Sequence, residues 1–299
     1  MNDRLQALRV FQRVARLGSF SRAGRERGLS QPSVSRIISD LEAALGATLF
    51  LRTTRAVALT EAGLAYLTQI EPLLAALDEA DYSVRGTGEL RGTLQVALSS
   101  GFGVREVVPR LPAFMAQHPA LRVNLNISDQ RQNLVTDGID IAFRLGDLPD
   151  SSAIARRLAS APRVLVASPG YLADAPPLAH PSDLARHHII AGPSIDPQQH
   201  WAFERDQRRL SVRIDGRIST GANEAAIAAA VAGLGIARAS SWGCRAELEA
   251  GALVTVLPEW RMAPVALHAI FPGVAGAPPA ARALADFVAE ALRAPDTLT

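Results

Sequence analysis

The side chains best suited to contacting the bases and phosphates of a nucleic acid lie in a short segment close to the N-terminus. From Ser30 to Leu45 the apolar residues recur at helical spacing, so one face of the predicted helix must pack on neighbouring helices. The opposite face carries small polar groups and one cation: Gln31, Pro32, Ser33, Ser35 and Arg36. Such a face can enter a DNA major groove and bond base edges and phosphates. The alternative is an ordinary solvent-exposed face, but such faces usually carry paired Glu, Lys and Arg residues, which this one lacks.

A second group of polar residues follows predicted strands in the C-terminal two thirds of the chain. Ser99-Ser100-Gly101 and Gly221-Ala222-Asn223 each stand where a strand ends and a helix begins. A helix N-terminus offers free N–H groups and a positive dipole, so these segments could hold the carboxylate of a small molecule. They could equally do no more than cap their own helices. Arg144 could supply a counter-charge to an acidic ligand, or it could pair with Asp140 or Asp147.

Catalytic chemistry finds little support in the sequence. Gly101-Phe102-Gly103 lacks the third glycine of a dinucleotide-binding fingerprint, and no serine stands in a Gly-x-Ser-x-Gly elbow. The six histidines, among them the neighbours His187 and His188, show no metal-ligand spacing. Cys244 has no motif around it, so a buried thiol is expected, with redox sensing as the alternative. We therefore expect no enzyme, no metal and no cofactor.

Composition and charge limit the classes of protein further. Hydrophobic residues make up 48% and charged residues 20% of the 299 residues, as in globular domains. No apolar stretch approaches the roughly 18 residues that span a bilayer, no secretory signal is visible, and a single cysteine excludes an internal disulfide. These features predict a cytoplasmic protein with no membrane partner. Residues 1–60 carry ten arginines against four acids, and such a local excess is typical of a module that binds a polyanion.

Three helices must hold the recognition face in place. Apolar spacing predicts a helix over residues 4–17, a short second helix, and then the recognition helix with Ser30 at its start. Three helices in this succession are typical of a helix-turn-helix. Residues 48–51 and 56–59 are predicted to form two short strands around the basic turn Arg52-Thr53-Thr54-Arg55. This wing is expected to lie along the phosphate backbone.

A long helix is predicted to follow the wing. Thr60 can cap it, and five apolar residues then recur at the three–four alternation of a coiled-coil seam: Leu64, Leu67, Ile70, Leu74 and Leu77. A helix with this stripe, and with Leu73 beside it, needs a partner, and a second copy of the chain is the simplest one. Pro72 should bend the helix, and the glycines of Arg85-Gly86-Thr87-Gly88 are expected to end it in a hinge.

Strands and helices alternate through the rest of the chain. The pattern predicts strands at 93–98, 121–128, 139–145, 163–168, 188–191, 210–218, 235–240, 253–257 and 264–271. Helices are predicted at 105–117, 130–137, 222–232, 242–249 and 278–292. The alternation indicates open, mostly parallel sheets in two subdomains, where ligands bind beyond the carboxyl ends of the strands. A stand-alone solute-binding protein would account for this part of the chain, but not for the basic N-terminal module.

In its ordered motifs the chain resembles the LysR-type transcriptional regulators over its whole length. The strongest part is Gly18-Ser19-Phe20-Ser21, followed by Leu29-Ser30-Gln31-Pro32-Ser33-Val34-Ser35-Arg36. The resemblance continues through Leu49-Phe50-Leu51-Arg52-Thr53-Thr54-Arg55 and Leu59-Thr60-Glu61-Ala62-Gly63. The C-terminal motifs Asp137-Gly138-Ile139-Asp140-Ile141-Ala142-Phe143-Arg144 and Gly233-Leu234-Gly235-Ile236 are weaker residue by residue.

The resemblance implies an α+β multi-domain fold: a winged helix-turn-helix over 1–60, a linker helix and hinge over 61–88, and an effector-binding domain over 89–299. That domain is expected to resemble a periplasmic binding protein, with subdomain I at about 92–162 and 266–299 and subdomain II at about 163–265. The resemblance also implies a homodimer through the linker helix, usually assembled to a homotetramer, and we expect it to bind an interrupted palindromic promoter site on double-stranded DNA. A small-molecule effector, with an anion as one candidate class, modulates that binding.

Carried over motif by motif, the resemblance assigns functional residues in both halves of the chain. DNA contacts are assigned to the recognition helix and the wing: Ser30, Gln31, Pro32, Ser33, Ser35, Arg36, Arg52, Thr54 and Arg55. The arginines among them are expected to contact phosphates. Effector contacts are assigned beside strand ends and at a helix start: Ser99, Ser100, Ser128, Asp129, Thr220 and Asn223. Arg144 joins these candidates as the possible counter-charge described above, not through the resemblance. Leu51 in place of a commonly acidic residue and Gly24 in place of a commonly small alanine depart from the family's pattern without threatening the assignment.

Overall fold

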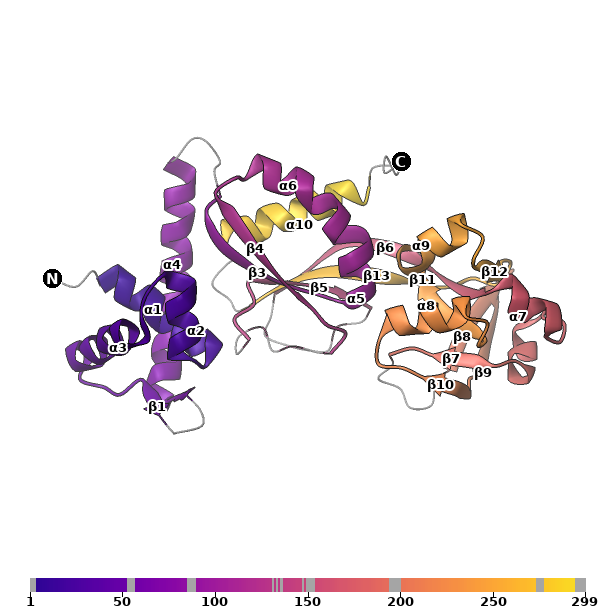
Figure 1. The fold of residues 1–299 in the computed structure, drawn as a ribbon, viewed down its shortest axis with the longest axis horizontal. Helices are drawn as coiled ribbons and strands as arrows, with labels where there is room; N and C mark the ends of the chain where they lie inside the picture. The colour runs from indigo at the N-terminus through magenta and orange to yellow at the C-terminus, as the bar shows by residue number, and fades with distance from the viewer. Residues whose placement is uncertain are drawn as a thin grey trace.

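The fold is known from a computed structural model that describes residues 4–52, 57–84, 90–130, 132, 134, 137–146, 148, 154–193, 200–272 and 277–293. Figure 1 shows three bodies in a row: a small N-terminal body of helices with a two-stranded wing, a central lobe and a distal lobe. The central one is called lobe I below, and the distal one lobe II. Helix α4 (Glu61–Val84) stands between the N-terminal body and lobe I (Figure 1).

The N-terminal body is a winged helix-turn-helix. Its helices are α1 (Arg4–Leu17), α2 (Phe20–Arg27) and α3 (Gln31–Leu45), and its wing pairs β1 (Phe50–Arg52) with β2 (Val57–Leu59) in antiparallel register. The hydroxyls of Ser19 and Ser30 accept backbone N–H groups of the first turns of α2 and α3, which fixes where these helices begin. The three predicted helices are confirmed, whereas the described strands of the wing begin one or two residues later than predicted.

Apolar side chains from every helix build the core of this body. Val10, Phe11 and Val14 of α1 are fully buried. Helix α3 adds Val34 and Ile38 to the same core, and α4 adds Leu67, Ile70 and Leu74. Gly24 of α2 faces the turn, where a Cβ would lie 2.7 Å from the carbonyl oxygen of Leu29. Close packing of α2 on this turn therefore requires the glycine, although glycine lowers helix propensity by about 1 kcal/mol relative to alanine.

The apolar stripe of α4 divides between two environments. Leu67, Ile70 and Leu74 are 3–4% exposed and pack on the chain's own winged helix-turn-helix. Leu64 and Leu73 are 56% and 66% exposed, and Leu77 is 36% exposed. The stripe therefore has a partner within its own chain for three of its side chains, because they complete the core of the small N-terminal body, and pairing with a second copy stays a prediction for the exposed leucines. The helix runs unbroken from Glu61 to Val84 through Pro72.

One nine-stranded mixed sheet runs through both lobes in the order β10-β7-β11-β6-β13-β5-β3-β4, with β12 (Val254–Val256) beside β6. Lobe I holds the parallel strands β3 (Gly92–Leu98), β4 (Leu121–Ile127) and β5 (Ile141–Leu145). Lobe II holds the parallel strands β7 (Ile189–Ala191), β10 (Gly216–Ser219) and β11 (Ile236–Ser240). The long antiparallel pair β6 (Ile154–Ala167) and β13 (Met262–Phe271) passes from one lobe to the other (Figure 1). Two strands, rather than a loop, therefore join the lobes.

Helices cover the sheet in each lobe. In lobe I a helical run begins as α5 (Ser100–Phe102), continues through a π-helical turn (Gly103–Val107) and a 3-10 turn (Val108–Arg110), and ends as α6 (Leu111–Gln117). Helix α10 (Pro279–Ala291) lies against α6, with the rings of Phe114 and Phe287 5.3 Å apart (Figure 1). Lobe II carries α7 (Pro169–Asp174), a 3-10 helix (Pro181–Arg186), α8 (Asn223–Val231) and α9 (Ser241–Glu249).

Two sequence predictions of secondary structure are wrong. None of the four described residues within 130–137 is helical, and Leu134 packs on the cluster that contains Ile139; the rest of this range lies outside the described residues. The strand predicted at 210–218 is two strands, β9 (Arg208–Arg213) and β10, and β9 forms a hairpin with β8 (His200–Arg205). Asp206 and Gln207 turn this hairpin with φ of 49° and 63°. The sequence hides the turn because both positions favour glycine or asparagine, and Asp-Gln is not a typical pair.

Each lobe has its own core, and an aromatic contact joins them. Phe102, Phe114 and Phe143 are buried in lobe I, while in lobe II one cluster surrounds Trp201 and another surrounds Cys244. Trp242 of α9 reaches the lobe I core, where its ring lies 5.7 Å from that of Phe102.

Candidate functional site

The outer face of α3 holds the residues predicted to read DNA. Four of them are exposed at the surface: Gln31, Pro32, Ser33 and Arg36. Ser35 is half-buried. Ser30 caps the helix, and its Oγ lies 2.8 Å from Ser33 Oγ, so these two hydroxyls sit together at the helix N-terminus. The opposite face packs inward, so the polar side of α3 faces outward.

Further basic groups lie on the helix that precedes α3 and on the wing. On α2, the helix before it, three arginines are exposed: Arg22, Arg25 and Arg27. The backbone of Arg52 ends β1 opposite Val57, while its side chain, Thr54 and Arg55 lie outside the described residues. From the sequence these three arginines count only toward the basic charge of the N-terminal module; the helical period of α2 is the signal that could have assigned them to its surface.

A cavity of about 160 Å³ lies between the two lobes. Lobe I contributes Ser99 and Gly146, which follow strands β3 and β5. Lobe II contributes Gly192 and Ser240, which follow or end β7 and β11, together with Asn223 at the start of α8. The carboxyl ends of parallel strands from both lobes therefore face one space, which is where open α/β sheets bind ligands.

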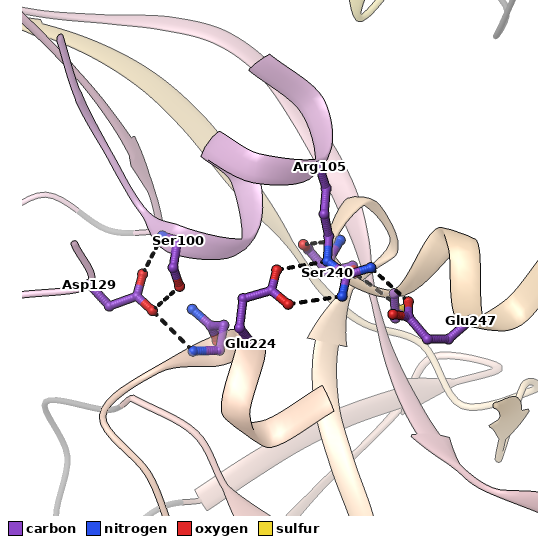
Figure 2. Close-up of polar contacts among 9 residues, drawn as sticks. Ser100, Arg105, Asp129, Glu224, Ser240 and Glu247 are labelled. Carbon is purple, nitrogen blue, oxygen red and sulfur yellow. Dashed lines mark hydrogen bonds and ion pairs between the residues drawn. The ribbon is translucent and has the colours of Figure 1, made fainter. Parts of the chain in front are cut away.

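A carboxylate of the chain itself occupies the predicted carboxylate cradle. Asp129 Oδ1 accepts the backbone N–H of Ser100 at 2.8 Å, and Oδ2 accepts the Ser100 hydroxyl at 2.5 Å and the backbone N–H of Asn223 at 3.1 Å (Figure 2). Asp129 thus binds the first residues of helices in both lobes. The inference that these helix starts can hold an anion fits this geometry, but the anion present is an internal one.

A second set of ionic contacts joins the lobes near the cavity. Arg105 in lobe I forms a bidentate pair with Glu224 of α8, at 2.7 and 2.9 Å, and its Nη1 donates to Glu247 of α9 at 2.8 Å (Figure 2). The pair with Glu224 raises the pKa of the Arg105 guanidinium above its usual range. Glu106 of lobe I, 3% exposed, pairs with Arg110 at 2.9 Å and with Arg245 of α9 at 3.4 Å. Burial raises the pKa of Glu106, against the opposing effect of the two arginines.

The residues predicted for the effector divide into two groups. Ser99 and Asn223 line the cavity, and Ser100 and Asp129 bridge the lobes beside it. The other three lie outside the cavity lining: Ser128, Arg144 and Thr220. Ser128 and Thr220 hydroxyls accept backbone N–H groups two residues on, which shapes local turns. Arg144 donates to the Ser128 carbonyl and to Gln132, so it holds the loop after β4.

Three further lining residues escaped the sequence analysis: Arg163, Trp201 and Arg238. Arg238 stands in β11, between alanines that are buried on the other face of the strand. An arginine in a short strand of apolar and small residues needs a ligand, a counter-ion or solvent. That pattern is the signal that could have singled it out.

Within the described ranges, no group of three His, Cys, Asp or Glu residues could hold a metal ion. None of the helices found there combines the length and the apolar run needed to cross a membrane. A larger, open depression of about 910 Å³ lies on lobe II, lined by residues such as Arg186, His188 and Arg217, and none of the predicted functional residues lines it.

A winged helix-turn-helix connected by a long helix to a two-lobed domain with an interlobe cavity defines a DNA-binding regulator that senses a small molecule. Family models agree with that class: residues 5–64 match a model described as "Bacterial regulatory helix-turn-helix protein, lysR family", and residues 87–293 match "LysR substrate binding domain". The chain belongs to the LysR family of transcriptional regulators. Regulators of this family bind DNA and small-molecule effectors, and they oligomerise.

Similar proteins cover nearly the whole chain. An HTH-type transcriptional repressor of Pseudomonas aeruginosa is 37% identical over 275 residues, which cover 91% of this chain and 86% of that protein. The regulator PtxR of the same species is 34% identical, covering 96% and 93%. Among solved structures, full-length AphB, a Vibrio cholerae virulence activator, is 30% identical at a TM-score of 0.57, covering 95% and 98%. CrgA of Neisseria meningitidis is 28% identical at a TM-score of 0.60, covering 97% and 98%.

Proposed function

We propose that this regulator binds an interrupted palindromic promoter site as a homo-oligomer and responds to a small molecule held between its lobes. The observation that carries the proposal is the union, in one chain, of an outward polar recognition face on α3 with an interlobe cavity. The proposed division is a DNA-binding domain over 1–60, a linker over 61–88 and an effector domain over 89–299, whose subdomains meet near residues 162 and 266. Its place of action is the bacterial cytoplasm, where promoter DNA lies.

The DNA-binding residues are proposed to have two kinds of role. Gln31, Pro32, Ser33 and Ser35 face the major groove and contact base edges, because they occupy the outward side of the first turns of α3. Arg36, Arg52 and Arg55 contact phosphates, with Ser30 and Thr54 as neutral backbone contacts. Exposure of Arg36 on α3 supports this division.

A homodimer is proposed to form through α4, and a tetramer from two such dimers. Leu64, Leu73 and Leu77 support the dimer, because they leave apolar surface on α4 after the other leucines have packed on the chain's own DNA-binding domain. Two copies joined in this way would present two α3 helices to two half-sites, which matches a palindrome by symmetry.

The effector is proposed to act by changing how the lobes meet. Asp129 and Arg105 hold the lobes together beside the cavity, so a ligand that enters must coexist with these contacts or displace them. A ligand that favours one arrangement shifts the equilibrium by its difference in affinity, with coupling of roughly 1–3 kcal/mol expected. Binding alone explains the cavity, and turnover of any metabolite by the purified protein would contradict this non-enzymatic role.

The proposal is tested by titrating the purified protein with its own upstream intergenic DNA over a series of salt concentrations, with scrambled DNA as control. Tight binding that prefers the native sequence at physiological salt is expected. Equally weak binding to both DNAs that falls steeply with salt would leave only a non-specific, electrostatic interaction. Absence of binding at low salt would contradict the role assigned to α3.

Arg36→Ala should weaken binding to all DNA sequences alike and reduce the slope of log K against log salt by about one, because one phosphate contact is lost. Arg209→Ala is the matched control, since it removes an equally charged, 85%-exposed side chain from the β8–β9 hairpin of lobe II. An unchanged slope for Arg36→Ala, or an equal reduction in both variants, would contradict the phosphate contact.

A further inference from the structure

Two arginines of lobe II face the interlobe cavity from neighbouring strands. In the antiparallel register of β6 and β11, Arg163 lies opposite Ser240 and Arg238 opposite Leu165. Opposed residues share a face of the sheet, and so do residues two positions apart, so Arg163, Arg238 and Ser240 point to the same side. All three line the cavity.

Arg238 has no acid to neutralise it within the described part of the chain. Its guanidinium carbon lies 5.4 Å from the ring centroid of Trp201, and no described carboxylate is among the groups that shift its pKa. Glu224 is the one acid among the cavity's described lining residues, and it is held by both of its oxygens on Arg105. Burial, and then repulsion from Arg163, lower the pKa of Arg238 to about 10. Among the described residues, no carboxylate therefore balances the charge of Arg238 on this part of the cavity wall.

Two neutral donors on the cavity lining, one from each lobe, are also unsatisfied. The Ser99 hydroxyl and the Trp201 indole N–H are buried on lining residues and have no hydrogen-bond partner among the described residues. Buried polar groups of this kind are normally paired, so the cavity calls for an occupant that accepts hydrogen bonds. Phe102 and Ile227 add apolar surface, which suits the carbon body of an organic molecule.

The hydrogen bonds of Asp129 favour a carboxylate over a phosphate as the anion in the cavity. The backbone N–H groups of Ser100 and Asn223, which would favour a phosphate at the helix starts, are already bonded to this carboxylate. What remains is the planar guanidinium of Arg238, whose fork can bind a carboxylate or a phosphate. A carboxylate needs no more than this fork, whereas a phosphate here would lack the helix-start N–H groups that Asp129 occupies. The cavity of about 160 Å³ is also smaller than the roughly 300–1,000 Å³ of pockets for drug-sized ligands, which limits the ligand to a small metabolite.

We propose that the effector is a small organic acid whose carboxylate binds Arg238, with Arg163 as the second cation, and whose carbon body lies against Trp201. This assignment rests on the proposed function, in which the interlobe cavity is the effector site. It places the anion on the strands of lobe II, rather than in the helix-start cradle that Asp129 fills.

Thermal unfolding of the full chain tests the assignment with acetate, succinate, benzoate and inorganic phosphate as probes, each compared with sodium chloride at equal ionic strength. A carboxylate that binds the folded protein raises Tm, by roughly 2–4 °C or more once its concentration is about tenfold above Kd. Arg238→Gln should abolish that rise. It should also raise the Tm without any probe, because it removes a buried cation that repels Arg163. The control Arg209→Gln removes an exposed arginine outside the cavity and should keep the response.

Three outcomes would overturn the assignment: no carboxylate raises the wild-type Tm above chloride, phosphate alone does so, or Arg238→Gln keeps the full response. Titration of the same wild-type sample with promoter DNA separates this result from the proposed function. Loss of specific DNA binding with an intact carboxylate response would overturn the regulator and leave the anion site. Specific DNA binding without any carboxylate response would overturn the anion site and leave the regulator.

Discussion

Cys244 lies in the first turn of α9, where its thiol donates to the Ser240 carbonyl at 3.4 Å. The side chain is fully buried in the cluster beneath α8 and α9. Burial raises the pKa of the Cys244 thiol to about 11, so almost none of it is thiolate at neutral pH. Because the thiolate is the reactive form, the structure favours an inert packing role over redox sensing.

Native Cys244 should therefore resist alkylation. Incubation with iodoacetamide at pH 8 should leave the folded protein unmodified by mass spectrometry, while the same treatment in guanidinium chloride should add one carbamidomethyl group, since the chain has a single cysteine. The denatured sample is the control for reagent activity. Stoichiometric labelling of the folded protein within minutes would mean that the thiol is accessible and that redox sensing is open again.

Single residues also show what the sequence could and could not reveal. The outward side chains of α3 follow from its own helical period, so Gln31, Ser33 and Arg36 could be assigned to the surface without a structure. Arg238 could be singled out as unusual in its strand but could not be assigned to a cavity, because the cavity that it faces is completed by Ser99 and Gly146 of the other lobe. Nor could local pattern reveal that Asp129, predicted as an effector contact, bonds to the helix starts itself.

Among the elements, the starts of α5 and α8 are joined across the lobes by one carboxylate. Asp129 is half-buried and accepts three hydrogen bonds, two from Ser100 and one from the backbone of Asn223. Helix N-termini carry partial positive charge, so a nearby carboxylate stabilises both helices and holds them together. This contact acts at the carboxyl ends of β3 and β10, where motion of the lobes would open or close the cavity.

Asp129→Asn should loosen this contact without changing the shape of the side chain. The amide cannot accept hydrogen bonds with both of its terminal atoms and carries no charge, so a loss of about 1–2 kcal/mol in the free energy of unfolding is expected. Urea unfolding measures the loss, and Asp174→Asn on the exposed end of α7 is the matched control. Equal stability of Asp129→Asn and the wild type would mean that the contact contributes nothing to closure of the lobes.

Helices and strands that depend on apolar spacing and capping residues could be predicted from the sequence, whereas those that depend on pairing with distant segments could not. The helices α1, α3 and α10 follow from their apolar spacing and caps. The first half of β6 and the β8–β9 hairpin escaped prediction, because β6 pairs with β13 across some 100 residues of sequence and the hairpin turn lacks glycine. The two faces of α4 were likewise hidden, since a stripe of leucines has the same spacing whether it packs on its own domain or on another copy.

In the whole molecule, Arg16 connects the DNA-binding domain to lobe I. From α1, its Nε donates to Glu71 of α4 at 2.9 Å and its Nη1 to Asp140 of lobe I at 3.1 Å. Asp140 is 9% exposed and also accepts the backbone N–H of Gln95. Burial raises the pKa of Asp140, and Arg16 opposes that rise. Gly138 lies at the same contact with a φ of 65°. A Cβ added there would lie 3.2 Å from Leu17 Cδ2, so the close approach of α1 favours glycine.

Removing Arg16 should therefore separate the unfolding of the DNA-binding domain from that of lobe I. Arg16→Gln leaves Asp140 and Glu71 without their cation, and breaking a buried pair typically costs about 3–5 kcal/mol. We expect calorimetry to resolve a lower-temperature transition in this variant, and Arg16→Gln with Asp140→Asn should recover part of the loss, because the buried charge is then gone as well. The control is Arg22→Gln, which removes an exposed arginine from α2. A single transition at the wild-type temperature in Arg16→Gln, or strict additivity in the double variant, would show that Arg16 and Asp140 do not couple the two domains.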